Sequence, residues 1–436
     1  MKTLIKLIVI GVIAGMTFNH LSEKKVDVKA AAQKFTEIIK DKISLIEAVI
    51  REENDREEAT MDSGNDSNRT FQVPGSGTLS PDAPPAAGNS FNSDREPDRS
   101  EIDLTGTDVR AAEIPIPQKS GHNRERFREL DRYAASVPAK LEGDMDMLVK
   151  YLIGPARNKT ERTRLVFSWI AQNIAYDDYG YNTGNYADVT AEAVFKNRVA
   201  VCQGFGQLFK VMGEKAGLDI VLVNGYAKGI SYRPGRSFED TNHAWNLVYL
   251  DNGWRHFDVT WAHGYGTAVK GKLVTIKEYD DYWFDTPADE FIFSHFPENP
   301  KWQLASVPLT LSQYERLPHA GASFFKLGFD GTACLQQACE GSLDAFPESY
   351  LNDGSVSALS MPYRKRIEAY RPIRIRLSSE YPADFALINN GEWVHLRKEG
   401  KEYSAVIAPE PGVLKLSSKR DDRSVSYNTL LEYRVN

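Results

Sequence analysis

The hydrophobic periodicity of this chain changes near Gly217 from a helical repeat to a strand repeat, and this change limits the folds open to the surrounding segment. Helical patterns precede the change, over 126–136, 145–151, 162–174 and 202–216. Strand patterns follow it, over 220–226, 243–250 and 254–261. The last two strands flank Asp251-Asn252-Gly253, and Asn-Gly between apolar runs is a strong hairpin signal. We therefore predict a compact α+β domain over residues 121–304.

Short strand patterns recur towards the C-terminus, with turn residues between them. They cover 324–329, 373–377, 385–388, 393–396, 403–407, 413–416 and 430–435. Asn389-Asn390-Gly391 separates two of these patterns and predicts another hairpin. Short strands at this spacing are typical of an immunoglobulin-like β-sandwich, which we predict for residues 305–436.

The first residues combine positive charge with an apolar run. Lys2 and Lys6 precede or border an apolar stretch over 7–18, which is the pattern of a secretory signal peptide. No small-x-small cleavage site follows at the usual distance, so an uncleaved membrane anchor within 1–22 remains the alternative. Both interpretations place the rest of the chain outside the cytoplasm, secreted, periplasmic or anchored at the outer face of the membrane.

Two further segments precede the α+β domain. Residues 23–56 carry apolar side chains at helical spacing among many charges, which predicts one amphipathic helix. Residues 57–120 are rich in Gly, Ser, Pro, Asn and Asp and show no apolar period. Such a composition buries too little apolar surface to offset the loss of chain entropy, so we predict a disordered linker.

Charge and cysteine content exclude several classes of function. The net charge is −7, and no stripe of Lys and Arg alternates with aromatic residues, so nucleic acid is not an expected partner. No Cys/His cluster has the spacing of metal ligands, and no cofactor or metal is predicted. Cys334 and Cys339 lie five positions apart, and their pairing or their presence as two separate thiols stays open. Cys202 has no partner nearby in the sequence.

Cys202 begins the helical pattern that ends before Gly217. Unpaired N–H groups and the positive end of the helix dipole favour a thiolate in a first helical turn. Gly204 and Gly206 leave room for another group to approach the start of this helix. Taken alone, a cysteine is more often a buried structural residue, because free Cys is among the most buried residue types.

His243 and Asp258 are the partners that would give this thiol a function. His243 begins a strand, and Asp258 lies in a mostly apolar strand, where a carboxylate is costly to bury without a donor. Together with Cys202 they provide a nucleophile, a base and a group that orients the base. His256 and His263 compete for the role of base. His256 ranks below His243 because it lies on the same face of the predicted strand as Asp258 and would need a further reason to reach the cleft.

The predicted hairpin does not by itself bring His243 and Asp258 together. A tight turn at Asn252-Gly253 would set Asp258 opposite Leu247, on the face of His243 but four residues from it. A bulge, a longer loop or a strong twist is then needed to bring the two side chains together.

Two runs around these residues resemble the transglutaminase-like superfamily. They are VCQGFGQLFKVMGEKAGLDIVLVNGYAKG and NHAWNLVYLDNGWRHFDVTW, and they resemble most the branch that includes kyphoscoliosis peptidase and many bacterial relatives. RLVFSWIAQNIAYDDYGY resembles the helix before the active site of that branch, and DDYWFDTPADEFIFSHFPENPKWQLAS resembles the segment that closes its core. The resemblance covers about 125–304.

This resemblance implies a papain-like core with Cys202 as nucleophile, His243 as base and Asp258 as orienter, and a β-rich module after it. The sequence departs from the branch at Gln203, where relatives often have an acidic residue, and at Phe205, where Tyr is common. It lacks the Cys-Trp pair and the acidic calcium loops of the animal cross-linking enzymes. Calcium-dependent cross-linking is therefore not expected.

The groups that would stabilise an oxyanion or hold a substrate are less defined. The backbone N–H of Cys202 is the natural first donor. Tyr176, Gln203 and Trp245 are further candidates, although a packed aromatic residue explains Tyr176 and Trp245 equally well.

We therefore hold two hypotheses. The first is an exported cysteine acyl-transfer enzyme that acts on peptide or side-chain amide bonds of a peptide or protein, with hydrolysis preferred to cross-linking. The alternative is a non-catalytic binding or scaffolding protein at the cell surface with the same fold, where the N-terminal segment gives the membrane tether.

Overall fold

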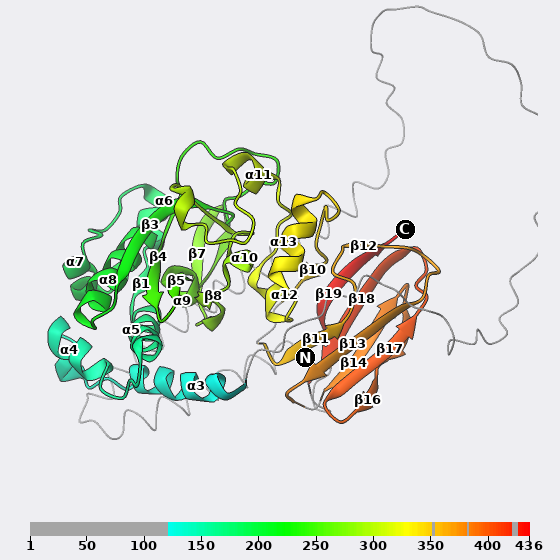
Figure 1. Cartoon of the computed structure of the whole chain (residues 1–436), viewed down its shortest axis with the longest axis horizontal. Coiled ribbons are helices and arrows are strands. Elements are labelled where there is room, and N and C mark those ends of the chain that lie inside the picture. The colour runs from blue at the N-terminus through cyan, green and yellow to red at the C-terminus, as the bar shows by residue number, and fades with distance from the viewer. Residues whose placement is uncertain (1–120, 351–353, 382, 421–425) are drawn as a thin grey trace, which may run out of the picture. The chain divides into compact units, whose positions relative to one another are not determined.

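The computed structural model describes residues 121–350, 354–381, 383–420 and 426–436 (Figure 1). The predicted signal or anchor segment (1–22), amphipathic helix (23–56) and linker (57–120) lie outside the described residues. Nowhere in the described ranges is a helix both long and apolar enough to cross a bilayer.

Helices dominate the first part of the described chain. They are α3 (Gly121–Ala135), η1 (Ala139–Leu141), α4 (Met145–Leu152), α5 (Lys159–Asn173), α6 (Asp178–Thr183), α7 (Ala191–Asn197) and α8 (Cys202–Lys215). The four predicted helices are confirmed as α3, α4, α5 and α8, with small shifts at their ends. Side-chain caps fix two of the starts, since Asp144 accepts from Met147 N and Asn158 from Glu161 N.

An antiparallel sheet follows, with strand order β8-β5-β4-β3-β9. Its strands are β3 (Ile220–Ala227), β4 (His243–Leu250), β5 (Gly253–Phe257), β8 (Phe284–Thr286) and β9 (His295–Pro297). Helix α8 lies along β3 and β4 (Figure 1). The approach is close, because a Cβ at Gly206 would overlap the Leu222 side chain and force it to move. The group for which Gly206 leaves room is therefore the sheet itself.

The predicted strand over 254–261 is wrong beyond Phe257. Asp258 ends the strand and caps helix α9 (Val259–His263), because its carboxylate accepts the first N–H groups of that helix. The predicted turn is also displaced, since Asp251 and Asn252 form the loop and Gly253 already pairs with Leu250. The register is thereby shifted by two residues relative to the expected one.

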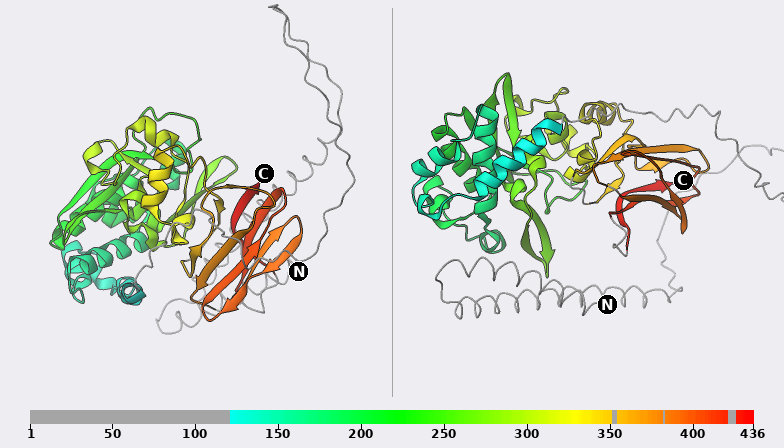
Figure 2. Two further views of the ribbon diagram at one scale, coloured as in Figure 1. Left: turned by 45° about the vertical axis from the view of Figure 1, so that its right-hand side comes forward. Right: turned by 90° about the horizontal axis from the view of Figure 1, so that it is seen from below.

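A two-stranded hairpin of β6 (Gly264–Val269) and β7 (Lys272–Lys277) projects from this domain (Figure 2). The outer edge of β7 is held by side chains of α6. Asn182 exchanges two hydrogen bonds of 2.8 Å with the backbone of Leu273, and Asp178 accepts from Thr275 N at 2.9 Å. Helix α6 therefore fixes the hairpin to the segment that precedes Cys202.

Residues 305–347 differ from the all-β prediction. The predicted strand over 324–329 is wrong, because helices α11 (Leu311–Arg316), α12 (Ala322–Lys326) and α13 (Gly331–Cys339) occupy this segment. A short apolar run without clear alternation does not distinguish a buried strand from a buried helix. Here Phe324 and Phe325 are buried against Phe293 and Phe346, and Asp330 caps α13.

The remaining chain forms two sheets. One has the order β11-β13-β17-β16 and the other β10-β19-β18-β14-β15, with β12 paired to β19. Their strands are β10 (Glu348–Ser349), β11 (Val356–Ser360), β12 (Arg366–Ile367), β13 (Ile373–Ser379), β14 (Asp384–Asn389), β15 (Glu392–His395), β16 (Arg397–Glu399), β17 (Glu402–Ile407), β18 (Gly412–Lys419) and β19 (Asn428–Val435). The six strands predicted after residue 370 are confirmed.

A tight turn and a contact between two aromatic rings explain the geometry of these sheets. Asn390 and Gly391 both adopt positive φ, 50° and 90°, which is the type I′ geometry that the Asn-Asn-Gly sequence predicts. The rings of Phe385 and Tyr403, one from each sheet, lie 4.7 Å apart and join the two buried faces.

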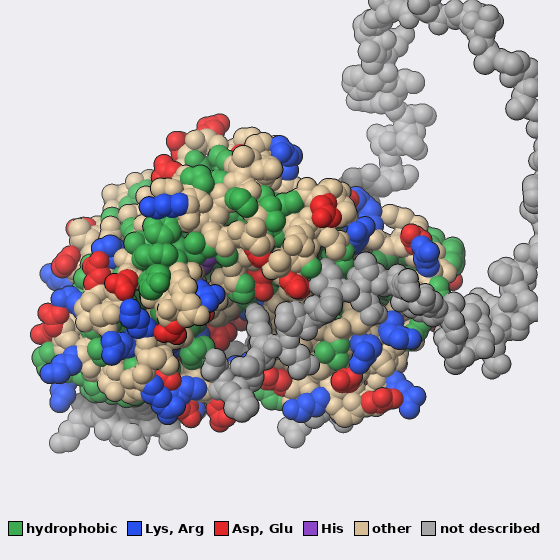
Figure 3. Space-filling view, viewed as in Figure 1, with side chains coloured by type: hydrophobic (Ala, Val, Ile, Leu, Met, Phe, Trp, Pro, Cys, Tyr) green, Lys and Arg blue, Asp and Glu red, His purple; other side chains and the backbone are tan. Residues whose placement is uncertain are grey.

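Charged side chains of both signs are interspersed on the face shown in Figure 3 rather than gathered by sign. The expectation that nucleic acid is not a partner stays a prediction.

The tight packing of the sheet behind the site generates a stability prediction. A Cβ at Gly225 of β3 would overlap the carbonyl oxygen of Phe296, which is backbone and cannot turn aside. We expect Gly225→Ala to destabilise the protein by about 1–3 kcal/mol or more, measured by chemical denaturation. Gly253→Ala is the matched control, because a Cβ there meets nothing within 4 Å. Equal stability of the two variants would contradict the packing described here.

Candidate active site

Cys202 is the first residue of α8, and the residue as a whole is half-buried. Val201 precedes it as the N-cap and gives no side-chain acceptor, and its carbonyl oxygen accepts from the N–H groups of Gly204 and Phe205. The earlier N–H groups of the first turn therefore point beyond the helix end. A short parallel pair, β1 (Ala175–Tyr176) with β2 (Val199–Ala200), sets Tyr176 level with Ala200, two residues before the thiol. Cys202 therefore lies at the positive end of the α8 dipole, and the β1–β2 pairing brings Tyr176 near it.

His243 begins β4 and lies next to Cys202. Its Nε2 atom lies 2.7 Å from Oδ2 of Asp258, so Nδ1 is the nitrogen left for the hydrogen bond with the Cys202 thiol. The neighbouring Asn242 fixes the start of this strand through two side-chain hydrogen bonds to the backbone of Ala227, at 2.7 and 3.0 Å. The ring is thus held between the thiol and the carboxylate.

Asp258 is completely buried and accepts four hydrogen bonds. Oδ1 accepts from the backbone N–H groups of Thr260 and Trp261, both at 2.9 Å. Oδ2 faces His243 Nε2 at 2.7 Å and His295 Nε2 at 3.0 Å. Because donors surround both oxygens, the carboxylate keeps its charge without water.

The electrostatics of the three groups agree with this geometry. Burial disfavours the charge on Asp258, but the His243 charge and the hydrogen bonds hold the pKa of Asp258 well below its usual value. Burial also opposes the charge on His243, yet Asp258 and the hydrogen bond to Cys202 raise the pKa of His243 to about 10. Burial disfavours the Cys202 thiolate, but His243 and the backbone N–H of Ala244 outweigh it and lower the pKa of Cys202. A thiolate–imidazolium pair is therefore favoured.

The register of β4 and β5 brings Asp258 closer to His243 than an ideal turn at Asn252-Gly253 would. Leu247 pairs with His256 and Asn246 with Phe257, so the next position, Asp258, falls level with Trp245 rather than with Leu247. Helix α9 then directs the carboxylate back towards the start of β4.

A cleft of about 510 Å³ lies over Cys202 and His243. Tyr176 and Gln203, two of the sequence candidates, line it together with Tyr181. Burial and the charge of Cys202 raise the pKa of Tyr176, so its hydroxyl stays neutral and able to donate. Their roles stay predictions.

Trp245 does not line this cleft. It is buried behind His243, 6.2 Å from that ring, and packs edge-on against His295 at 5.3 Å. It closes the rear of the site to water and does not face the cleft.

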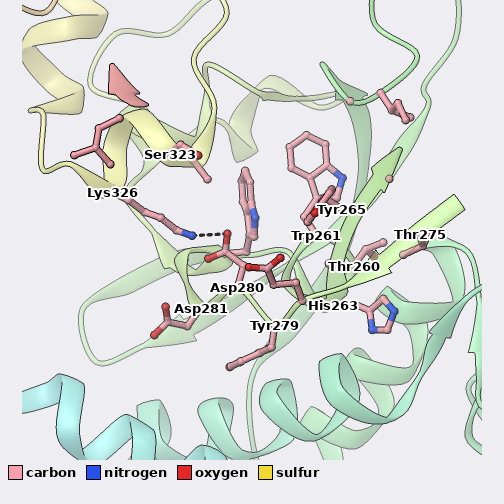
Figure 4. Close-up of a pocket in the computed structure, with 18 of the residues that line it drawn as sticks. Thr260, Trp261, His263, Tyr265, Thr275, Tyr279, Asp280, Asp281, Ser323 and Lys326 are labelled. Carbon is pink, nitrogen blue, oxygen red and sulfur yellow. Dashed lines mark ion pairs between the residues drawn. The ribbon is translucent and has the colours of Figure 1, made fainter. Parts of the chain in front are cut away.

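A second hollow adjoins His243 on the side of the hairpin (Figure 4). Trp261 and Tyr265 form one wall, and Asp280, in an ion pair of 2.7 Å with Lys326, forms another. Tyr176, Tyr181 and His243 line both hollows, so His243 lies where they meet.

The competing histidines are engaged elsewhere. His256 is buried, stacks on Phe291 at 4.4 Å and faces the carbonyl oxygen of Gln303, and burial lowers its pKa to about 3. His263 is buried and bonds to the carbonyl oxygen of Ala171 at 2.8 Å. Neither contacts Cys202.

His295 is the residue that the sequence analysis missed. It lies in the buried run 291–297, and a histidine in such an apolar stretch is the same signal that singled out Asp258. His243, Asp258 and His295 also form the one group among the described residues whose ligand atoms, all within 4.8 Å, fit a metal ion. Because both histidine nitrogens face one buried oxygen at hydrogen-bond distance, we assign these contacts as hydrogen bonds.

The other two thiols are not paired with each other. Cys334 is buried and Cys339 is exposed, and both are free cysteines of α13.

Comparison with known proteins identifies the family of this domain. Residues 146–259 match the transglutaminase-like superfamily, a range that contains Cys202, His243 and Asp258. The chain is 30% identical over 316 residues to Kyphoscoliosis peptidase of Homo sapiens, which covers 71% of this chain and 43% of that protein. It is 30% identical over 216 residues to Hillarin of Drosophila melanogaster, covering 46% of this chain and 26% of that protein. It is 30% identical over 213 residues to Lim and transglutaminase domain protein ltd-1 of Caenorhabditis elegans, covering 46% and 29%. The chain spans less than half the length of these curated relatives.

The raised pKa of His243 generates a pH-dependent stability. A folded-state pKa of about 10, above the unfolded value of about 6.5, stabilises the fold fully below pH ~6.5, and this contribution is lost as the pH rises through the folded value. We compare Cys202→Ala with Cys202→Ala/His243→Gln, so that the thiol does not titrate. The difference in Tm should be largest below pH ~6.5 and should shrink as the pH rises through the folded pKa of His243, which in this background keeps the elevation from Asp258 and loses the part from Cys202. A constant difference would show that Asp258 does not hold a charged His243.

Proposed function

Because residues 146–259 form a transglutaminase-like domain of the kyphoscoliosis peptidase-like branch, we propose that this chain is a cysteine acyl-transfer enzyme that acts on peptide or side-chain amide bonds. One observation carries the proposal. The Cys202 thiol, the His243 ring and the buried Asp258 carboxylate form a continuous hydrogen-bonded chain at the bottom of an open cleft. This is the arrangement of nucleophile, base and orienter that acyl transfer requires.

In the first step, the Cys202 thiolate attacks the carbonyl carbon of the amide. The S–C bond forms, the C=O π bond breaks with its electron pair moving to oxygen, and a tetrahedral intermediate with an oxyanion results. His243, charged at the outset, gives its proton to the leaving nitrogen as the C–N bond breaks. An amine or ammonia departs, and the acyl group remains on sulfur as a thioester. Asp258 keeps the ring aligned throughout, because Oδ2 holds Nε2 at 2.7 Å.

In the second step, water takes the place of the departed amine. His243, now neutral, removes a proton from the water as its oxygen attacks the thioester carbon. The C–S bond breaks, the carboxylic acid leaves, and the thiolate–imidazolium pair returns. Hydrolysis is our preferred outcome, and the name of the relative Kyphoscoliosis peptidase supports it.

The oxyanion of each step needs donors near the sulfur. The backbone N–H of Cys202 at the start of α8 has no side-chain cap to satisfy it and is the first donor. We propose the neutral hydroxyl of Tyr176 as the second, because it lines the cleft and lies close enough to Cys202 for the thiolate charge to raise its pKa. Gln203 lines the same cleft and is proposed as a substrate contact.

The open space on both sides of His243 supports a peptide or protein substrate. A segment in extended conformation would pass over the ring from the cleft at Gln203 to the hollow at Tyr265. The exposed side chains of Tyr186 and Tyr265 would meet its side chains.

We also propose that the two C-terminal sheets form an immunoglobulin-like module. The order β11-β13-β17-β16 corresponds to strands A-B-E-D, and β19-β18-β14-β15 to G-F-C-C′. Export remains a proposal as well, supported by the Lys-plus-apolar pattern of residues 1–22.

The proposal is tested with the full chain and reductively methylated casein, an unfolded protein probe. We expect new N-termini or released ammonia, and a smaller incorporation of dansylcadaverine. Cys202→Ala and His243→Ala should lower the rate by about 10³-fold or more, and Asp258→Asn by about 10²-fold or more. Cys339→Ser is the control, because it removes an exposed thiol that lines neither hollow.

Equal product from wild type and Cys202→Ala would refute the proposal. Predominant incorporation of dansylcadaverine would keep acyl transfer and overturn the preference for hydrolysis.

A further inference from the structure

His295 occupies a position that the acyl-transfer chemistry above does not explain. Its side chain is completely buried, and its Nε2 atom lies 3.0 Å from Oδ2 of Asp258, the same oxygen that receives His243. A buried imidazole with a polar partner at each nitrogen has a fixed orientation, and here one of the partners is the carboxylate of the candidate site.

The second partner determines which nitrogen carries the proton. Ser294 Oγ lies 2.8 Å from His295 Nδ1 and 3.2 Å from the carbonyl oxygen of Phe291. Oδ2 of Asp258 is an ionised acceptor, so Nε2 must be the donor and Nδ1 the acceptor of a neutral ring. The single proton of the Ser294 hydroxyl therefore goes to Nδ1 at 2.8 Å in preference to the Phe291 carbonyl oxygen at 3.2 Å, and the hydrogen bonds run in one direction from Ser294 through His295 to Asp258.

Four aromatic rings hold His295 in place. Phe291 stacks on it at 4.0 Å with an interplanar angle of 14°, and Trp261 lies at 4.3 Å. Trp245 and Trp283 meet it edge-on at 5.3 and 5.5 Å. These rings exclude water, which strengthens the hydrogen bond to Asp258.

The ring remains neutral in this setting. Burial lowers the pKa of His295 to about 4, although the hydrogen bond to Asp258 acts in the opposite direction. The titratable groups around it are Asp258, His243, whose ring centre is 5.3 Å away, and His256. Since His243 carries the positive charge of the pair, a second charge on His295 would be repelled.

From this geometry we propose that His295 is a positioning residue that fixes the carboxylate of Asp258, so that its Oδ2 lone pair points at Nε2 of His243. The inference rests on the proposed function and adds a fourth member, with Ser294 as a fifth, to the chain that activates Cys202. Without the His295 donor, only His243 would hold Oδ2, and the carboxylate could tilt about the axis of its two backbone hydrogen bonds.

The test compares two substitutions that separate the donor from the ring. His295→Phe keeps an aromatic ring stacked on Phe291 but removes the N–H donor, whereas His295→Gln loses the ring but presents an amide N–H near the position of Nε2. We expect His295→Phe to lower kcat about 10-fold or more, with KM changed by less than about twofold. His295→Gln should recover most of the loss, to within about threefold of wild type.

A merely structural role predicts the opposite ranking. Phe would fill the aromatic site at least as well as His, and Gln would place an amide among four aromatic rings. Equal or higher kcat in His295→Phe than in His295→Gln, with both variants folded by thermal unfolding, would overturn the proposal.

A spectroscopic readout separates this inference from the proposed function. In ¹⁵N spectra of the full chain labelled at histidine, His295 should be neutral with its proton on Nε2, and Ser294→Ala should shift the resonance of the unprotonated Nδ1 while the proton stays on Nε2. A proton on Nδ1 in the wild type would refute the assignment, whatever the activity. An inactive wild type with the Nε2–H form would refute the proposed function alone.

Discussion

The buried charge of Asp258 is the constraint on which the site depends. A carboxylate taken out of water is strongly destabilising unless donors replace its hydration, and here four donors do so. Two come from the start of α9, one from β4 and one from β9. The carboxylate therefore fixes how three separate parts of the domain meet, and the orientation of His243 towards Cys202 follows from that meeting.

Local elements were predictable because their signals are local. The start of α8 at Cys202 and of β4 at His243 follow from apolar periodicity, and the Asn390-Gly391 turn follows from the φ values it needs. The site residues Cys202, His243 and Asp258 are brought together as the sequence predicts.

Other features depend on tertiary context and were missed. The capping role of Asp258 ends β5 early, and the loop at Asp251 and Asn252 sets a register that an ideal Asn-Gly turn does not give. The helix at 322–326 follows from packing of Phe324 and Phe325, which a short apolar run does not specify. His295 reaches Asp258 only because β9 pairs with β3, a contact between distant segments.

The central claim is that His243, aligned by Asp258, holds Cys202 as a thiolate. The most direct measurement is the pH dependence of Cys202 alkylation by iodoacetamide in the full chain with Cys339→Ser, with and without His243→Ala. The account predicts fast alkylation of Cys202 well below pH ~8.5, the value of an ordinary thiol, and loss of that advantage in His243→Ala. Ordinary or absent reactivity that His243→Ala leaves unchanged would contradict the account and would favour a non-catalytic binding protein.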